Sequence, residues 1–340
     1  MKSTKIFASV LIILAVVLVA GCGDDDTKGQ AGYGEDSIDM IFDTEGRSVF
    51  DSNEDFIITM TVENFGPFDV ENVKTKLIGF GGLTTVGTPL STDVLLATKL
   101  DRPRPELEVA GGFATKDWEV VAPNVSADSP DVEVLLTSEV YYRTKSLGVQ
   151  KVVVAEKDYI DKLAARGEII PVNPMTDSMN GPISLDMAVP DPYVTIRQEN
   201  ESLRVKISLD NDGSGTVYAR PDLSEGKNTD YLESVTLKVP VGLRVDLANC
   251  DFDITVVDGW TADATATNSS KEKILYIDGT STAKLPKLRL MEGGLRRDLA
   301  CTLLVDKETY VSGYQTFELY AQADYSYMQD AIRSVIISGT

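Results

Sequence analysis

The sequence predicts an all-β protein that contains two β-sandwich domains in tandem. Apolar and polar residues alternate with period two in many segments, as over residues 56–62 and 203–209, and Gly, Pro and Asn separate these segments at short intervals. Alternation places every second side chain on one face of a strand, so each segment is expected to bury one face. Many short strands joined by such turns are typical of a sandwich.

The N-terminal segment has the pattern of a secretory signal. Lys2 and Lys5 precede an apolar run over residues 6–20. As a helix this run would span about 22 Å, which is short of the roughly 30 Å hydrocarbon core of a bilayer, so a transmembrane helix is the weaker interpretation. Residues 19–22 (Val-Ala-Gly-Cys) resemble the lipobox of prokaryotic lipoproteins. That resemblance implies a lipoprotein signal peptide over residues 1–21 and lipidation of Cys22. The alternative is an ordinary signal with a chance cysteine.

A flexible acidic tether is predicted over residues 22–34. This stretch lacks periodicity and contains four glycines between residues 23 and 34. Without Lys2 and Lys5, the mature chain has 53 acidic against 30 basic residues, a net charge of −23. Such a charge opposes binding to nucleic acid and adhesion to an anionic surface through charge. The expected location is the outer face of the cell membrane, lipid-anchored and extracytoplasmic.

Two domains are predicted on either side of a short helix and a linker. The first β-sandwich covers residues 35–167 and ends in the helical stretch 156–167, where Tyr159, Ile160 and Leu163 share one side. Pro and Gly cluster over residues 168–181, which is the predicted linker. Residues 182–340 form the second sandwich. Separate strands are expected at residues 132–142 and 150–155.

The two halves repeat one pattern. Residues 62–66 match residues 209–213 at an offset of 147, whereas residues near the domain ends match at about 184, so the second domain contains an insertion, expected between residues 220 and 285. Residues 57–73 and 203–218 resemble the opening of CARDB-type immunoglobulin-like domains, and residues 34–66 resemble the start of archaeal lipid-anchored envelope proteins. These resemblances imply a spacer or adhesion module without catalytic residues.

The absence of histidine excludes Ser-His-Asp and Cys-His catalysis and histidine-based zinc sites. With Cys22 committed to lipid, Cys250 and Cys301 are the available pair in an exported protein, and both lie on the apolar face of their strands. We therefore predict a disulfide between them. The alternative is two buried free thiols.

Three triplets are glycosylation acceptors, at Asn124, Asn200 and Asn268. If the source organism glycosylates asparagine, we expect at least one to be used. Asp210, Asp212 and Ser214 resemble the start of an EF-hand loop, but Pro221 occupies the twelfth position where that loop needs Glu. A hairpin turn using Asn and Gly for positive φ is the favoured interpretation, and we predict no metal and no cofactor. A looser calcium site there, or at Asp251 and Asp253, is the alternative.

Aromatic residues are candidates for a ligand surface, but at period two they are usually core. This applies to Trp118, Trp260, Tyr141, Tyr142, Tyr325 and Tyr327. The favoured function is a non-enzymatic, lipid-anchored envelope protein with a structural, adhesive or protein-binding role, whose partner is a protein or glycan at the cell surface. The alternatives are a solute-binding lipoprotein of a transporter and a surface hydrolase with buried carboxylates.

Overall fold

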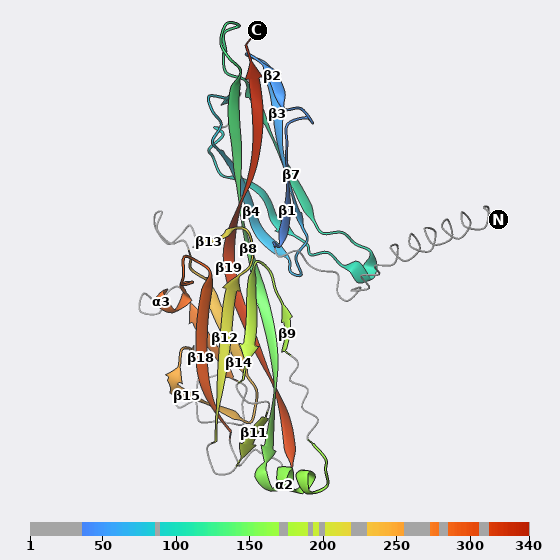
Figure 1. Cartoon of the computed structure of the whole chain (residues 1–340), viewed down its shortest axis with the longest axis vertical. Helices are drawn as coiled ribbons and strands as arrows, with labels where there is room; N and C mark the ends of the chain where they lie inside the picture. The colour runs from blue at the N-terminus through green and yellow to red at the C-terminus, as the bar shows by residue number, and fades with distance from the viewer. Residues whose placement is uncertain are drawn as a thin grey trace, which may run out of the picture. The chain divides into compact units, whose positions relative to one another are not determined.

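Three mainly antiparallel sheets account for most of the described chain (Figure 1). The structure is a computed structural model that describes residues 36–339 apart from 86–88, 170–175, 190–192, 197–200, 219–229, 255–272, 279–284 and 306–312. The first four-stranded sheet has the spatial order β1 (Ile38–Asp43), β3 (Asp55–Asn64), β7 (Phe113–Val121), β5 (Thr84–Thr85). The second has the order β10 (Ile183–Ala188), β12 (Ser202–Asn211), β18 (Arg296–Val305), β15 (Leu243–Cys250).

The third sheet is the largest and is shared by both halves of the chain. Its spatial order is β16 (Asp253–Ile254), β17 (Lys273–Asp278), β14 (Ser234–Val239), β19 (Tyr314–Ser338), β8 (Val132–Glu156), β4 (Val70–Ile78), β6 (Val94–Leu100). Four short strands lie off this path: β11 (Tyr193–Ile196) and β9 (Thr176–Met179) pair with β8, and β13 (Thr216–Tyr218) and β2 (Val49–Asp51) pair with β19. The described helical elements are η1 (Pro105–Leu107), α2 (Lys157–Ala165) and α3 (Leu285–Leu288).

The all-β class predicted from the period-two pattern is confirmed. Along β3, Phe56, Ile58, Met60 and Val62 are buried while the residues between them are partly exposed. β12 alternates in the same way. The predicted helix is also present as α2, and its Tyr159, Ile160 and Leu163 pack against Val153 and Ala155. Gly167, at φ 72°, ends it by adopting a left-handed conformation that other residues rarely adopt.

The repeat of the sequence is also a repeat of topology. β1 and β3 of the first sheet correspond to β10 and β12 of the second, because Ile38 pairs with Asn64 as Ile183 pairs with Asn211. The place of β4 is taken in the second half by β13 and β14, which both pair with β19. The insertion expected between residues 220 and 285 stays a prediction, and much of it lies outside the described residues.

β8 and β19 are single 25-residue strands that pair from Ala155–Tyr314 to Val132–Ile337, and Figure 1 shows them side by side in green and red. The gap expected between residues 142 and 150 does not exist. The pattern weakens there because the inward positions hold Thr144, Ser146 and Gly148 instead of large apolar residues. Position 148 requires glycine because a Cβ there would lie only 2.5 Å from Cδ2 of Leu185.

The shared ladder bears directly on the predicted domains. The end of β19 runs beside first-half strands, and its Ile336, Ile337 and Ser338 pair with β2. One hydrophobic cluster includes buried residues of both halves, and the chain from residue 33 to 340 forms one compact unit. The boundaries 35–167, 168–181 and 182–340 stay a prediction, which the shared strands allow us to test.

Candidate functional site

Two equivalent corners carry the chain from a small sheet to the shared sheet. At Asn64, the side-chain amide donates to the carbonyl oxygens of Phe68 and Leu100, 2.9 and 3.0 Å away. The amide of Asn211 donates to the carbonyl oxygen of Gly215 in the same manner. The side chain thus replaces the strand hydrogen bonds that the backbone loses as it changes sheets.

The glycines of these corners are required by close packing rather than by positive φ. Neither Gly66 nor Gly213 adopts a positive φ, which corrects the sequence-based interpretation of a positive-φ hairpin turn. A Cβ on Gly66 would lie 2.9 Å from Cβ of Ser37, and one on Gly213 would lie 2.6 Å from Oη of Tyr327. The pattern Asn-x-Gly therefore marks a tightly packed corner between sheets.

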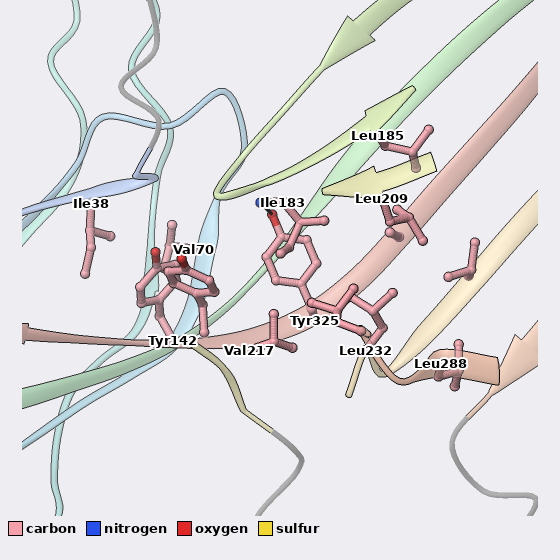
Figure 2. Close-up of a cluster of buried hydrophobic side chains, with 14 of the residues drawn as sticks. Ile38, Val70, Tyr142, Ile183, Leu185, Leu209, Val217, Leu232, Leu288 and Tyr325 are labelled. Carbon is pink, nitrogen blue, oxygen red and sulfur yellow. Dashed lines mark hydrogen bonds between the residues drawn. The ribbon is translucent and has the colours of Figure 1, made fainter. Parts of the chain in front are cut away.

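Buried tyrosines join the halves where the centres of β8 and β19 meet. Tyr142 of β8 donates to Oε1 of Gln329 at 3.1 Å, and Oη of Tyr325 lies 3.0 Å from Oγ of Ser146. We call these four residues the tyrosine junction. Figure 2 shows Tyr142 beside Ile38 and Val70 of the first half, and Tyr325 beside Ile183 of the second. Each ring thus packs in one half and bonds across the ladder.

Through Ser214, which accepts a hydrogen bond from Nε2 of Gln329, the tyrosine junction is connected to Asp36, the first residue that the structure describes. Ser214 donates from its backbone nitrogen and its hydroxyl to the carboxylate of Asp36, each at 2.9 Å. Burial raises the pKa of Tyr142 and of Tyr325 well above the ordinary phenol value. Both rings therefore stay neutral hydrogen-bond donors at ordinary pH, which suits a structural role rather than acid–base chemistry.

A cleft of about 390 Å³, here called the tyrosine cleft, lies against β4, β8 and β13. Its lining includes Lys76, Tyr141, Tyr218 and Arg143. The rings of Tyr141 and Tyr218 meet edge-to-face at 5.3 Å, and the Lys76 ammonium lies 5.1 Å from the centre of the Tyr141 ring. Of the tyrosines considered in the sequence, Tyr142, Tyr325 and Tyr327 are buried in the core, and Tyr141 is only partly buried. Tyr141 and Tyr142 both line this cleft.

A second cleft, of about 540 Å³, is lined by several cations and is called here the arginine cleft. The loop after β6 contributes Arg102 and Arg104, and β8 contributes Arg143 and Lys145. Its acidic lining residues are Asp69, Glu71 and Asp324. Sequence reasoning missed this cluster. The sequence feature that could have indicated it is Arg102-Pro103-Arg104, where two arginines lie close together in a chain with a net charge of −21.

Arg143 lines both clefts and is held by carboxylates. Its Nε donates to Oε2 of Glu233 at 2.7 Å, and its Nη1 lies 3.7 Å from Glu71. The Glu233 side chain is only 6% exposed and also accepts a hydrogen bond from Ser326. A buried carboxylate with two donors is satisfied, so Arg143 and Glu233 position the wall between the clefts.

The predicted site residues are described only in part. Cys22, Asn200, Asn268 and Trp260 lie outside the described residues. Asn124 is exposed after β7, and its Oδ1 lies 3.3 Å from Oγ of Ser52. Its use as a glycosylation acceptor stays a prediction.

Cys250 and Cys301 are joined in a disulfide. It links the neighbouring strands β15 and β18 where their register shifts between Asp246 and Cys250. Cys301 is buried and Cys250 is half-buried against the core. Trp118 is also in the core.

The described acids do not gather into a metal site. Within the part of the chain that the structure describes, no three acidic or cysteine side chains are grouped so that they could hold an ion. Ser214 is bound to Asp36, and Asp251 accepts from the backbone of Ala300 and lies 3.4 Å from Lys287. Also among described residues, no helix has the length and apolar character needed to cross a membrane.

The fold and its junction define an all-β protein made of packed, mainly antiparallel sheets. No family model matches the chain, and no curated protein matches it. Among solved structures it is similar to a protein of Corynebacterium diphtheriae described as a candidate membrane-anchored protein, with 9% identity, 89% of this chain and 92% of that chain covered, and a TM-score of 0.20. It is also similar to a collagen adhesin of S. aureus. The identity is 10%, the match covers 89% of this chain and 95% of the adhesin chain, and the TM-score is 0.13. Scores this low carry no argument about function, and the CARDB-type resemblance stays a prediction.

Proposed function

We propose that this chain is a lipid-anchored protein of the cell envelope, displayed on the outer face of the membrane, with a structural or adhesive role and no catalysis. The observation that carries the proposal is the continuous ladder between β8 and β19. Hydrogen bonds along both 25-residue strands tie the two halves into a common sheet, so the two halves can present their surface as one body.

The attachment of the tether supports the same role. A tether over residues 22–34 would enter the fold at Asp36, whose carboxylate is bound by Ser214 of the other half. A pulling force applied through Cys22 would therefore act on the contact between Asp36 and Ser214, which joins the two halves. Two acyl chains hold a protein on a membrane far better than one, since each buried CH₂ contributes about 0.8 kcal/mol.

The acids of the described clefts favour binding over hydrolysis. A glycosidase needs one carboxyl group with a raised pKa beside a second that stays ionised. In the arginine cleft, partial burial acts to raise the pKa of Asp69, but hydrogen bonds from Lys99 and from the Arg102 backbone outweigh it and lower this pKa overall. Glu71 lies beside Arg143. These acids are placed as partners of cations.

The solute-binding alternative has less support in the fold. Such lipoproteins usually close two α/β lobes around a cleft, whereas the described fold is all-β with short helices. A deep, closing cleft is what that function requires.

The test of the proposal is the fate of Cys22→Ser in cells. The wild-type chain should partition into the detergent phase and carry lipid on Cys22 by mass spectrometry. The variant should lose the lipid and accumulate as an uncut precursor, while Ser9→Ala in the same signal serves as the control and should behave as wild type. Lipid-free wild-type protein in the aqueous phase would refute the anchoring. Turnover of glycosides by purified protein would refute the absence of catalysis.

A further inference from the structure

Three cations of the arginine cleft form no ion pair with a carboxylate of the described residues. Lys145 has no carboxylate within 4 Å among the described residues and lies over the Phe68 ring at 5.5 Å. The Arg104 side chain is exposed and makes no ion pair with any described residue, while its backbone bonds to Val109 and Leu107. Arg102 makes one weak side-chain bond, to the carbonyl of Pro67 at 3.4 Å.

The acids of this cleft, in contrast, already have partners. Asp69 lies 2.7 Å from Lys99 and accepts from the backbone of Arg102. Asp324 accepts hydrogen bonds from Ser234 and Gln322. Glu71 in turn lies 3.7 Å from Arg143. Four cations line the cleft against these three carboxylates, so its lining is net positive, and Arg102, Arg104 and Lys145 are the cations that form no ion pair with a described residue.

We propose that the arginine cleft binds a short segment of an acidic glycan, with Arg104 and Lys145 pairing with its carboxylates. Guanidinium groups match a carboxylate with two parallel donors, and such charge-assisted hydrogen bonds are about twice as strong as neutral ones. A volume of about 540 Å³ falls in the range of small-molecule sites, so it accommodates a few sugar rings.

The lining favours a sugar acid over an acidic peptide. Carboxylate oxygens of Asp69, Glu71 and Asp324 have lone pairs left to accept from ring hydroxyls, which a uronic acid supplies and a polyglutamate chain lacks. Phe68, Leu147 and Met179 add apolar surface against which a sugar ring can pack. This combination of cations, acceptors and apolar side chains fits a polyhydroxylated anion.

The net charge of the chain does not prevent this binding. At physiological ionic strength the screening length is about 8 Å, so acidic residues beyond the cleft contribute little to the potential inside it. The same charge disfavours long polyanions that would lie along the acidic surface. Preference for a short oligomer over a long one therefore follows from the charge distribution.

The inference deepens the proposed adhesive role but its test does not depend on the anchor. Calorimetry with trigalacturonic acid uses the full chain, purified from whichever cell fraction holds it, at 0.15 M salt. The methyl ester of the same trisaccharide keeps the rings and free hydroxyls but loses the charge. The acid should bind, and the ester should bind at least tenfold more weakly.

The matched variants remove equal charge inside and outside the cleft. Arg104→Gln with Lys145→Gln should weaken binding of the acid at least tenfold, whereas Arg166→Gln with Lys162→Gln, both exposed on or just after α2, should stay within twofold of wild type. Arg104→Gln alone is the second variant if the double variant melts early. Equal loss in both double variants would overturn the inference. So would equal binding of the ester, tighter binding of hexaglutamate, or no binding of the acid at millimolar concentration.

Discussion

Reducing the Cys250–Cys301 disulfide should lower the stability of the whole β body. The two cysteines are 51 residues apart, and in the chain-entropy model closing a loop of that length restricts the unfolded chain by roughly 4 kcal/mol at 25 °C. The bond lies beside a register shift between β15 and β18, where the ladder gives less restraint.

The shared strands determine how this loss should appear in a melting curve. If the roughly 300 residues of the body unfold together, their unfolding entropy is about 0.6 kcal/mol/K, and about 4 kcal/mol corresponds to a decrease in Tm of roughly 6–7 °C. If residues 182–340 instead unfold as an independent domain, the same loss would lower one of two transitions by roughly 12 °C and leave the other unchanged. We expect the first outcome, because β8 and β19 cross the predicted boundary.

The assay is differential scanning calorimetry of the mature protein with and without a phosphine reductant. Cys250→Ala with Cys301→Ala is the control and should show no response to reductant. A Tm that moves by less than about 1 °C in the wild type would refute the estimate of roughly 4 kcal/mol. Two transitions, of which one is insensitive to reductant, would refute the shared-ladder reasoning and support two independently folding sandwiches.

Two further predictions concern other parts of the fold. Ile337→Ala should cost about 2–5 kcal/mol in chemical denaturation because this side chain is fully buried beside β2, whereas Ile336→Ala on the opposite face should cost about 0.5 kcal/mol; equal costs would contradict a structural role for the end of β19. The pKa of Asp69 lies below its unfolded value, so its contribution to stability is present above the unfolded pKa and is lost as pH falls through the folded pKa. Lys99→Met should raise the Asp69 pKa in an NMR titration, and an unchanged titration would argue against the Lys99 hydrogen bond as its cause.

The individual strands and the class of fold could be predicted from the sequence because both are local. Alternation over residues 56–62 and 203–209 reports which face of a strand is buried, and the structure places those residues in β3 and β12. The helix α2 could also be predicted from the sequence, because its apolar residues have helical spacing and Gly167 follows it as a helix-ending residue. The pairing of Cys250 with Cys301 was also predicted from the sequence, because both lie on the apolar face of their strands and they are the pair that remains once Cys22 is assigned to lipid. The structure joins these two cysteines.

The continuity of β8 and β19 was decided by tertiary structure. Ser146 and Gly148 give little strand signal by composition. They are in a strand because Ser146 contacts Tyr325 and because Gly148 leaves room for the Leu185 side chain. The arginine cleft has the same origin, as it joins a loop after β6 to the centre of β8. Contacts between residues that are far apart in the chain depend on packing, and no local pattern in the sequence encodes them.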